Sequence, residues 1–431
     1  MSPSSPIQVR ALVGLSTLCF VLLLAACSEP AAIVCVDETC PVGQACGVSG
    51  CEPLQVPTDL GDLGRYTRTR VDSSGHLVIA TYDSTHGNLV LMRQGEKKTT
   101  QTILVDGFRV EAHAVVETDS GRFPSLALDE SDRVHLSWYD ADNGELRYAA
   151  IAENTPWQWE VVDGAGASDR GRHSSLAVAE DGSLHIAYRD ETTRSLRYAT
   201  KAAGGLWESR DVTGCSATEE CPIVGEENYG EYASLALIAG QARIVFYDRL
   251  RGDLKLASQR SDGGFTVTTL DGSDPVTGID TGDVGRFAKV AVDPKRRLAV
   301  AYFDATGKSL RYLFEGSGSL QPNVIDFGVV SDEETGTLRT HVVGQHVALR
   351  FDPQGRALLM YLDATALKLK RATLIGEKLI EIGFVEDLPA GGSIDFDIAP
   401  NGNLKGAYGA WLPNAAPRTK LETFELDAVM P

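Results

Sequence analysis

The fold of this chain is decided by a motif that residues 125–150 show in full: SLALDESDRVHLSWYDADNGELRYAA. It contains three short runs of apolar and aromatic residues, separated by turns rich in Asp, Asn, Ser and Gly. The middle run ends at Asp140, and Leu146 follows six residues later. Runs of this length, bounded by such turns, predict antiparallel β-strands joined by hairpins.

The same motif recurs from about Gly64 to the end of the chain. The middle run ends in an aspartate six times, at Asp83, Asp140, Asp190, Asp248, Asp304 and Asp363, and a seventh run ends at Ala410. The intervals between these positions are 57, 50, 58, 56, 59 and 47 residues. A leucine stands six residues after every aspartate, at Leu89, Leu146, Leu196, Leu254, Leu310 and Leu369. Such intervals are typical of solenoid or propeller repeats.

Each repeat predicts one small sheet. A fourth apolar run follows the leucine run, for example from Trp159 to Val162 and from Phe265 to Leu270. The runs are apolar on both faces, so each sheet must be covered on both sides. Four-stranded sheets that stand around a channel cover one another in this way. The sequence therefore predicts an all-β fold over residues 54–431: a seven-bladed β-propeller of four-stranded antiparallel blades.

The last repeat contains only three of the four runs. Its third run ends at Leu426, and five residues remain after it. We expect residues 54–59 to supply the missing strand and to close the ring, with Pro57 on an outer edge, where a missing N–H is tolerated.

Residues 1–26 have the character of a signal peptide. A polar start with one cation, Arg10, leads into an apolar run from Ala11 to Leu24, which is too short for a stable membrane span. The run ends in Leu24-Ala25-Ala26-Cys27, which resembles the lipobox of bacterial lipoproteins.

This resemblance to bacterial lipoproteins implies a lipid anchor. Cleavage before Cys27 and acylation of that residue, with palmitate among the acyl chains, would tether the mature chain to the bacterial cell envelope. Several acyl chains anchor a protein stably, whereas one alone is marginal. Ser28 after the cysteine implies the outer membrane, on its periplasmic or outer surface.

Six further cysteines remain in the exported part. Four of them, Cys35, Cys40, Cys46 and Cys51, lie in a lipidated, cysteine-rich tether that spans residues 27–53, and Cys215 and Cys221 enclose a short loop. Disulfides suit an oxidising compartment. Zinc sites prefer cysteines two residues apart, a spacing that is absent here, so we predict disulfides rather than a metal. The pairing within the tether stays open among three alternatives.

The charge of the chain limits its partners. With 40 Lys and Arg against 59 Asp and Glu, the formal net charge is -19. Such a surface repels phosphate backbones, so we predict no nucleic-acid partner, and the membrane is reached only through the lipid anchor. No paired metal-ligand spacing and no glycine-rich phosphate loop is present, so we predict neither a metal site nor a cofactor.

A second repeated feature predicts a ligand site. Most repeats begin with glycine, a polar residue and an aromatic ring, as in Gly121-Arg122-Phe123, and in five repeats the polar residue precedes the aspartate by 18 positions. A simple hairpin would pair Arg65 with Asp83, Arg122 with Asp140, Arg172 with Asp190, Arg286 with Asp304, and would set Glu231 against Asp248. These pairs would surround the channel mouth. They are interpreted either as ion pairs that fix the strand ends or as a site for an anionic or polar small molecule or glycan.

The function is left open between binding and catalysis. The turn Asp-x-x-Gly gives the chain a distant resemblance to sialidase-like propellers, but it lacks the serine and the trailing aromatic residue of their repeated box. No nucleophile motif is present, so the catalytic residues are unknown. The favoured hypothesis is a non-enzymatic scaffold that binds a protein, a peptide or a polysaccharide. The alternative is a glycoside hydrolase or lyase with carboxylates at the channel mouth.

Overall fold

The computed structural model describes residues 44–47, 50–53, 60–95, 100–111, 114–152, 158–164, 166, 168–213, 228–273, 278–316, 320–331, 335–412 and 418–427. Every regular element in these ranges is a β-strand. No helix that is long and apolar enough to cross a membrane occurs in them. The chain divides into a smaller unit, residues 1–58 with 109–116, and a larger unit, residues 59–108 with 117–431.

The smaller unit contains a hairpin of β1 (Gln44–Gly47) and β2 (Gly50–Pro53). Its antiparallel register sets Cys46 opposite Cys51. The signal segment, Cys27, Cys35, Cys40, Cys215 and Cys221 lie outside the described residues, so the anchor and the disulfides stay predictions.

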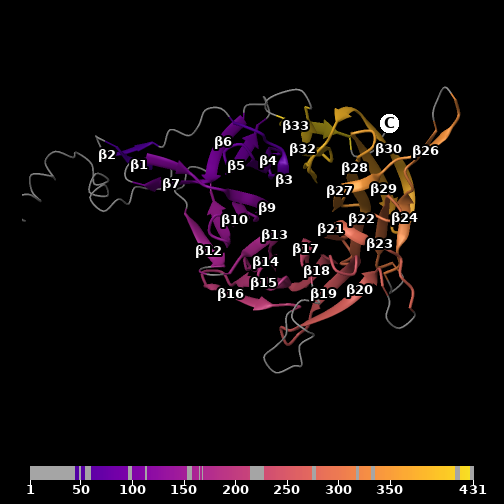
Figure 1. The fold of residues 1–431 in the computed structure, drawn as a ribbon, viewed down its shortest axis with the longest axis horizontal. Coiled ribbons are helices and arrows are strands. Elements are labelled where there is room, and N and C mark those ends of the chain that lie inside the picture. The colour runs from indigo at the N-terminus through magenta and orange to yellow at the C-terminus, as the bar shows by residue number, and fades with distance from the viewer. Residues whose placement is uncertain are drawn as a thin grey trace, which may run out of the picture. The chain divides into compact units, whose positions relative to one another are not determined.

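The larger unit is a ring of sheets, which Figure 1 shows around a common centre. The first two repeats form one eight-stranded sheet from β3 (Arg65–Val71), β4 (Leu77–Asp83), β5 (Asn88–Gln94), β6 (Thr100–Asp106), β9 (Ser120–Leu128), β10 (Val134–Asp140), β11 (Glu145–Ile151) and β12 (Trp159–Asp163). The next two form four-stranded sheets from β13 (Arg170–Val178), β14 (Leu184–Asp190), β15 (Ser195–Lys201) and β16 (Trp207–Asp211), and from β17 (Glu231–Ile238), β18 (Gln241–Asp248), β19 (Asp253–Gln259) and β20 (Phe265–Asp271).

Two more four-stranded sheets and one three-stranded sheet complete the ring. They consist of β21 (Val284–Val292), β22 (Leu298–Asp304), β23 (Ser309–Phe314) and β24 (Asn323–Asp326); of β27 (Val343–Phe351), β28 (Arg356–Asp363), β29 (Lys368–Ile375) and β30 (Lys378–Pro389); and of β31 (Ile394–Ile398), β32 (Leu404–Trp411) and β33 (Thr419–Leu426). Two small pairs lie outside these sheets: β7 (Phe108–Glu111) with β8 (Ala114–Glu117), and β25 (Val329–Ser331) with β26 (Leu338–Thr340).

The all-β propeller is confirmed, but the blade count differs from the predicted seven. Five sheets are separate blades, four with four strands and one with three, and the sixth is the eight-stranded sheet. The cause is a single parallel pairing, Asn88 with Ser120, which joins β5 to β9. The three-stranded last sheet agrees with the three runs of its sequence. Residues 54–59, expected to supply its fourth strand, lie outside the described residues.

Both markers of the repeat are core positions. All six marker leucines are 0% exposed, which explains why no other residue type replaces them. The six marker aspartates are also buried, and each accepts a backbone N–H from the turn that follows it; Asp140 Oδ1, for example, accepts from Asp142 N at 3.0 Å. Buried carboxylates need such partners because an unpaired polar group in the core is costly.

Serine side chains on the inner strands connect one blade to the next. Ser125 Oγ accepts the N–H of Leu176 at 2.9 Å, and Ser234 Oγ accepts the N–H of Val290 at 3.1 Å. Ser175 Oγ accepts the N–H of Leu235 in the same way. These bonds satisfy N–H groups that face the channel, where no further strand is available.

The ring closes through the same kind of bond, between β31 and β3. Ser393 Oγ accepts the N–H of Thr67 at 2.8 Å, and Asp395 Oδ2 accepts the N–H of Thr69 at 3.0 Å. The carboxylate of Asp397 continues the row on Val71. Direct side-chain bonds from the last blade to the first therefore hold the ring, whatever residues 54–59 add.

Candidate functional site

The site begins with an unusual backbone at the start of each inner strand. The aromatic residue of the glycine–polar–aromatic motif has a φ between 52° and 58° in six repeats, at Tyr66, Phe123, His173, Tyr232, Phe287 and His346. The left-handed region costs a residue with a side chain about 1–2 kcal/mol, and such strain is concentrated at functional sites. The preceding glycine is needed too: a Cβ on Gly121 would lie 2.6 Å from the backbone nitrogen of Leu89.

This backbone turns the six aromatic residues toward one another across neighbouring blades. Consecutive ring centroids lie 4.4 to 5.2 Å apart, from Tyr66 through Phe123, His173, Tyr232 and Phe287 to His346. The seventh repeat has Ser393 at this position. The aromatic arc formed by these six rings is therefore open at one place, between His346 and Tyr66.

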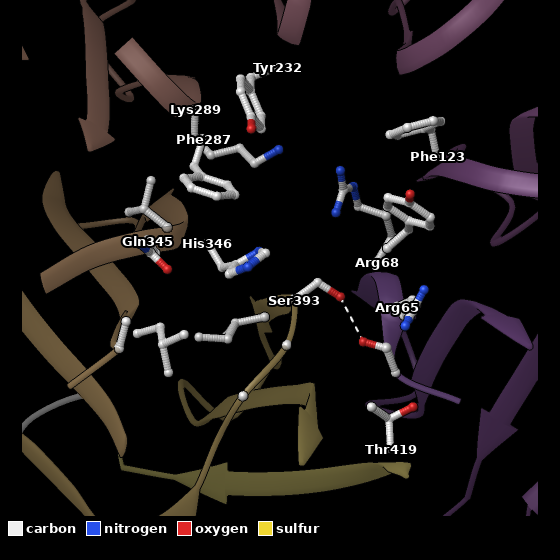
Figure 2. A pocket seen from close by; sticks show the side chains of 18 of the residues that line it. Arg65, Arg68, Phe123, Tyr232, Phe287, Lys289, Gln345, His346, Ser393 and Thr419 are labelled. Atoms are coloured by element: carbon white, nitrogen blue, oxygen red, sulfur yellow. Dashed lines mark hydrogen bonds between the residues drawn. The ribbon is translucent and has the colours of Figure 1, made fainter. Parts of the chain in front are cut away.

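The aromatic arc borders a cavity of about 640 Å³ at the ring's centre. Residues of the seventh repeat line the cavity at the gap in the arc: Gly391, Gly392, Ser393 and Trp411. Figure 2 shows Arg68 and Lys289 reaching into it from opposite sides. Among the described residues that line the cavity none is Asp or Glu, whereas Arg65, Arg68 and Lys289 are cations.

None of these three cations forms an ion pair with a described residue. Arg68 donates to the carbonyl oxygen of Thr67 at 2.8 Å but forms no ion pair with a described residue. The ammonium of Lys289 has no hydrogen-bond or ion-pair partner among them. Burial lowers the pKa of Arg68, and burial together with Arg68 holds the pKa of Lys289 well below its usual value. The cavity is therefore a positive region in a chain of strongly negative charge.

The acids of β31 form ion pairs with cations that do not line the cavity. Asp395 Oδ1 lies 2.9 Å from Arg350 Nη2, and its Oδ2 lies 3.7 Å from Arg70 Nη1. Asp397 approaches Arg350 at 3.7 Å. None of these four residues lines the cavity. The acids of β31 thus form ion pairs with Arg70 and Arg350, while the negative charge of Asp395 also acts on Arg68 and Lys289 without an ion pair.

The titratable aromatic residues of the arc are uncharged near neutral pH. Burial and neighbouring cations lower the pKa of His173 to about 3 and that of His346 to about 4. Burial raises the pKa of Tyr66 and Tyr232. The cavity therefore presents neutral imidazoles as proton acceptors and phenol groups as proton donors.

The predicted Arg–Asp pairs across the first hairpin are wrong. The left-handed residue creates a β-bulge, so Arg122 lies opposite Tyr139 and Asp140 lies opposite Ser120. In the same way Arg286 lies opposite Phe303, Arg172 opposite Arg189 and Arg65 opposite Tyr82. A count of residues along the chain does not reveal the bulge, so the simple hairpin pairing failed.

Three of the predicted arginines connect neighbouring blades instead. Arg286 Nη2 lies 2.5 Å from Asp283, whose carboxylate accepts the hydroxyl of Tyr247 in the preceding blade at 2.8 Å. Arg122 with Asp119 and Tyr82, and Arg172 with Asp169 and Tyr139, repeat this arrangement. These three arginines do not line the cavity, whereas Arg65 does.

The remaining predicted pair, Glu231 with Asp248, is not formed either. Glu231 pairs with Arg249 at 2.9 Å, and Asp248 is fully buried with Lys255 at 3.7 Å. The other marker aspartates bind Arg147, Arg170, Arg311 or a histidine.

The sequence reasoning missed Arg68 and Lys289. Their signal was a cation inside an inner strand, where the other repeats have serine, alanine or, in the seventh, Asp395.

No family model and no curated protein sequence matches the chain. Among solved structures, the polysaccharide lyase Uly1 is similar with a TM-score of 0.51 and 12% identity, over 92% of this chain and 95% of that one. An intramolecular trans-sialidase from Ruminococcus gnavus has a TM-score of 0.47 and 13% identity, over 91% and 99% of the chains. At such identity the likeness to the lyase shows the fold alone, and it agrees with the all-β propeller found here.

Proposed function

We propose that the cavity binds an acidic saccharide, that is, a sugar ring carrying a carboxylate. The observation that carries this proposal is a cavity bordered by six aromatic rings and containing Arg68, which forms no ion pair with a described residue, with no acid among the described residues that line the cavity. Aromatic faces pack against the apolar faces of sugar rings, and a guanidinium matches a carboxylate with two parallel hydrogen bonds.

We propose that the protein cleaves this ligand by β-elimination. Of the two enzyme classes that the sequence left open, hydrolase and lyase, this is the reaction of a lyase. Hydrolysis in most glycosidases needs two carboxylates that flank the bond, and the described lining residues supply none. Elimination beside a carboxylate needs a cation on that carboxylate, a base for the adjacent proton and an acid for the leaving oxygen. Arg68 supplies the cation, His346 or His173 the base, and Tyr66 or Tyr232 the acid.

The test is a panel of polysaccharides offered to the purified protein. We expect uronate polymers such as polygalacturonate and alginate to be cleaved, with a rise in the ultraviolet absorbance of the unsaturated product, and neutral dextran to stay intact. Arg68→Met should remove the activity, because the carboxylate loses its counter-charge. Arg122→Met is the matched control, since Arg122 lies outside the cavity. Binding of acidic polymers without a product would leave only the binding role, and equal binding of dextran would contradict the acidic ligand.

We propose further that the seven repeats act as seven blades and that Cys27 anchors the protein to the bacterial envelope. In support, the eight-stranded sheet consists of two antiparallel four-strand groups with one pairing between them. A polysaccharide substrate would be met outside the cytoplasm, where a lipid tether holds the enzyme. Labelled palmitate should enter the wild-type chain, while Cys27→Ser should take up none and leave the membrane fraction.

A further inference from the structure

Lys289 is a cavity residue that the proposed elimination does not use. On the inner strands of earlier blades, Ser125, Ser175 and Ser234 stand at the matching position and accept a backbone N–H from the next blade. Lys289 makes no such bond, and its ammonium has no partner among the described residues. A long cationic side chain that contributes no bond to the ring is therefore not explained by the fold.

Its surroundings favour the neutral amine. Arg68 and Arg70 on β3, and Arg350 on β27, all act on it with like charge, and Asp395 on β31 is the acid that opposes them. That carboxylate is already engaged by Arg350 and by the N–H of Thr69. The imidazoles of His173 and His346 face the same space and are neutral near pH 7. An amine that is buried beside another cation gains nucleophilic character.

We propose that Lys289 forms an imine with an anionic aldehyde or ketone bound in the cavity, while Arg68 holds the carboxylate of that ligand. The proposal rests on the proposed function only in sharing its cavity and its acidic ligand class, of which the open-chain form of a uronic acid is a member. The amine nitrogen attacks the carbonyl carbon and a C–N bond forms. The amine nitrogen loses its two protons, which pass to the carbonyl oxygen, and the C–O bond breaks as water leaves. Hydrolysis reverses the step, and neither direction needs an oxidant or a reductant.

The test uses glyoxylate, which joins an aldehyde to a carboxylate, with cyanoborohydride to reduce the imine to a stable amine. The full protein is labelled at pH 7, and peptide mapping compares Lys289 with the exposed Lys378. We expect Lys289 to gain a carboxymethyl group at least about tenfold faster, because each unit of lowered pKa gives about ten times more neutral amine. The ratio should fall as the pH is raised toward 10, where Lys378 also becomes neutral.

Two controls separate reactivity from recognition. Acetaldehyde lacks the carboxylate, so its preference for Lys289 should be smaller than that of glyoxylate. Arg68→Met should slow labelling of Lys289 by glyoxylate and leave Lys378 unchanged. Equal labelling of the two lysines at pH 7, or equal preference for the two aldehydes, overturns the proposal. Saccharide binding without an adduct refutes the imine alone, and an adduct without saccharide binding refutes the proposed function alone.

Discussion

At the scale of single residues, two charged positions recur in the sequence, and the structure gives them different roles. The marker aspartates are buried and accept a backbone N–H from the turn that follows them, whereas three of the four arginines of the glycine–polar–aromatic motif lie between blades and are partly exposed. Both recurrences could be predicted from the sequence. Their partners could not, because the left-handed aromatic residue adds a bulge that shifts the pairing.

The two roles predict unequal costs within one blade. Asp304 is 1% exposed, accepts from Gly307 N at 2.6 Å and pairs with Arg311 at 2.7 Å. Asp304→Ala removes one of the two carboxylates that bind Arg311, Asp271 being the other, and leaves the N–H of Gly307 without its acceptor, so the free energy of unfolding should fall by about 1–3 kcal/mol. Arg286→Ala removes the ion pair with Asp283, whose two side chains are 42% and 34% exposed. The free energy of unfolding should therefore fall by less than about 1 kcal/mol. Urea unfolding of both variants measures the difference, and equal losses would contradict the assignment.

The histidines of the aromatic arc predict acid sensitivity. The pKa of His346 lies near its ordinary value of 6.5 in the unfolded chain and at about 4 in the folded one. As the pH falls from about 6.5 to about 4 the unfolded state binds the proton first, so stability decreases in that window. His346→Phe places the phenyl ring that Phe123 and Phe287 have at the same position of their repeats. The melting temperature of this variant should fall less between pH 7 and pH 5 than that of the wild type. Phe287→His should show a larger fall in melting temperature than the wild type over the same pH range. The opposite order would show that protonation of the buried imidazoles does not cause the acid sensitivity.

At the scale of elements, the sequence predicts the strands better than their ends. The turns after the first run and the all-buried middle strands lie where the repeat places them, as in β10 and β22. The bulges were not foreseen, because they arise from the left-handed backbone of the aromatic residue in each first hairpin. The serine bonds between blades, and the single pairing between β5 and β9 that merges two sheets, were not foreseen because they depend on a neighbouring blade.

The serine bonds predict a measurable contribution from the inner strands. Ser234→Ala leaves the buried N–H of Val290 without its acceptor, so the free energy of unfolding should drop by about 1–3 kcal/mol. Ser131 is exposed, and its backbone N–H rather than its hydroxyl binds Asp129, so Ser131→Ala should stay within about 0.5 kcal/mol of wild type. Equal stability of the two variants in chemical unfolding would show that the bonds between blades are not needed.

At the scale of the whole molecule, the ring brings together residues that the sequence keeps far apart. The repeat was sufficient to predict a propeller, and it suggested a ligand site at the channel mouth. It did not predict that Arg68 and Lys289, on the first and fifth inner strands, share one cavity that no acid of β31 lines. That requires knowing which inner-strand side chains face the channel, and the bulge decides this.

The most direct test is a crystal structure of the protein with an oligosaccharide of the uronate polymer that it binds or cleaves best. We predict a sugar ring against the aromatic arc, with its carboxylate at hydrogen-bond distance from the guanidinium of Arg68. A saccharide bound on the outer strands of the blades, or one in the cavity with its carboxylate turned away from Arg68 and Lys289, would contradict the account.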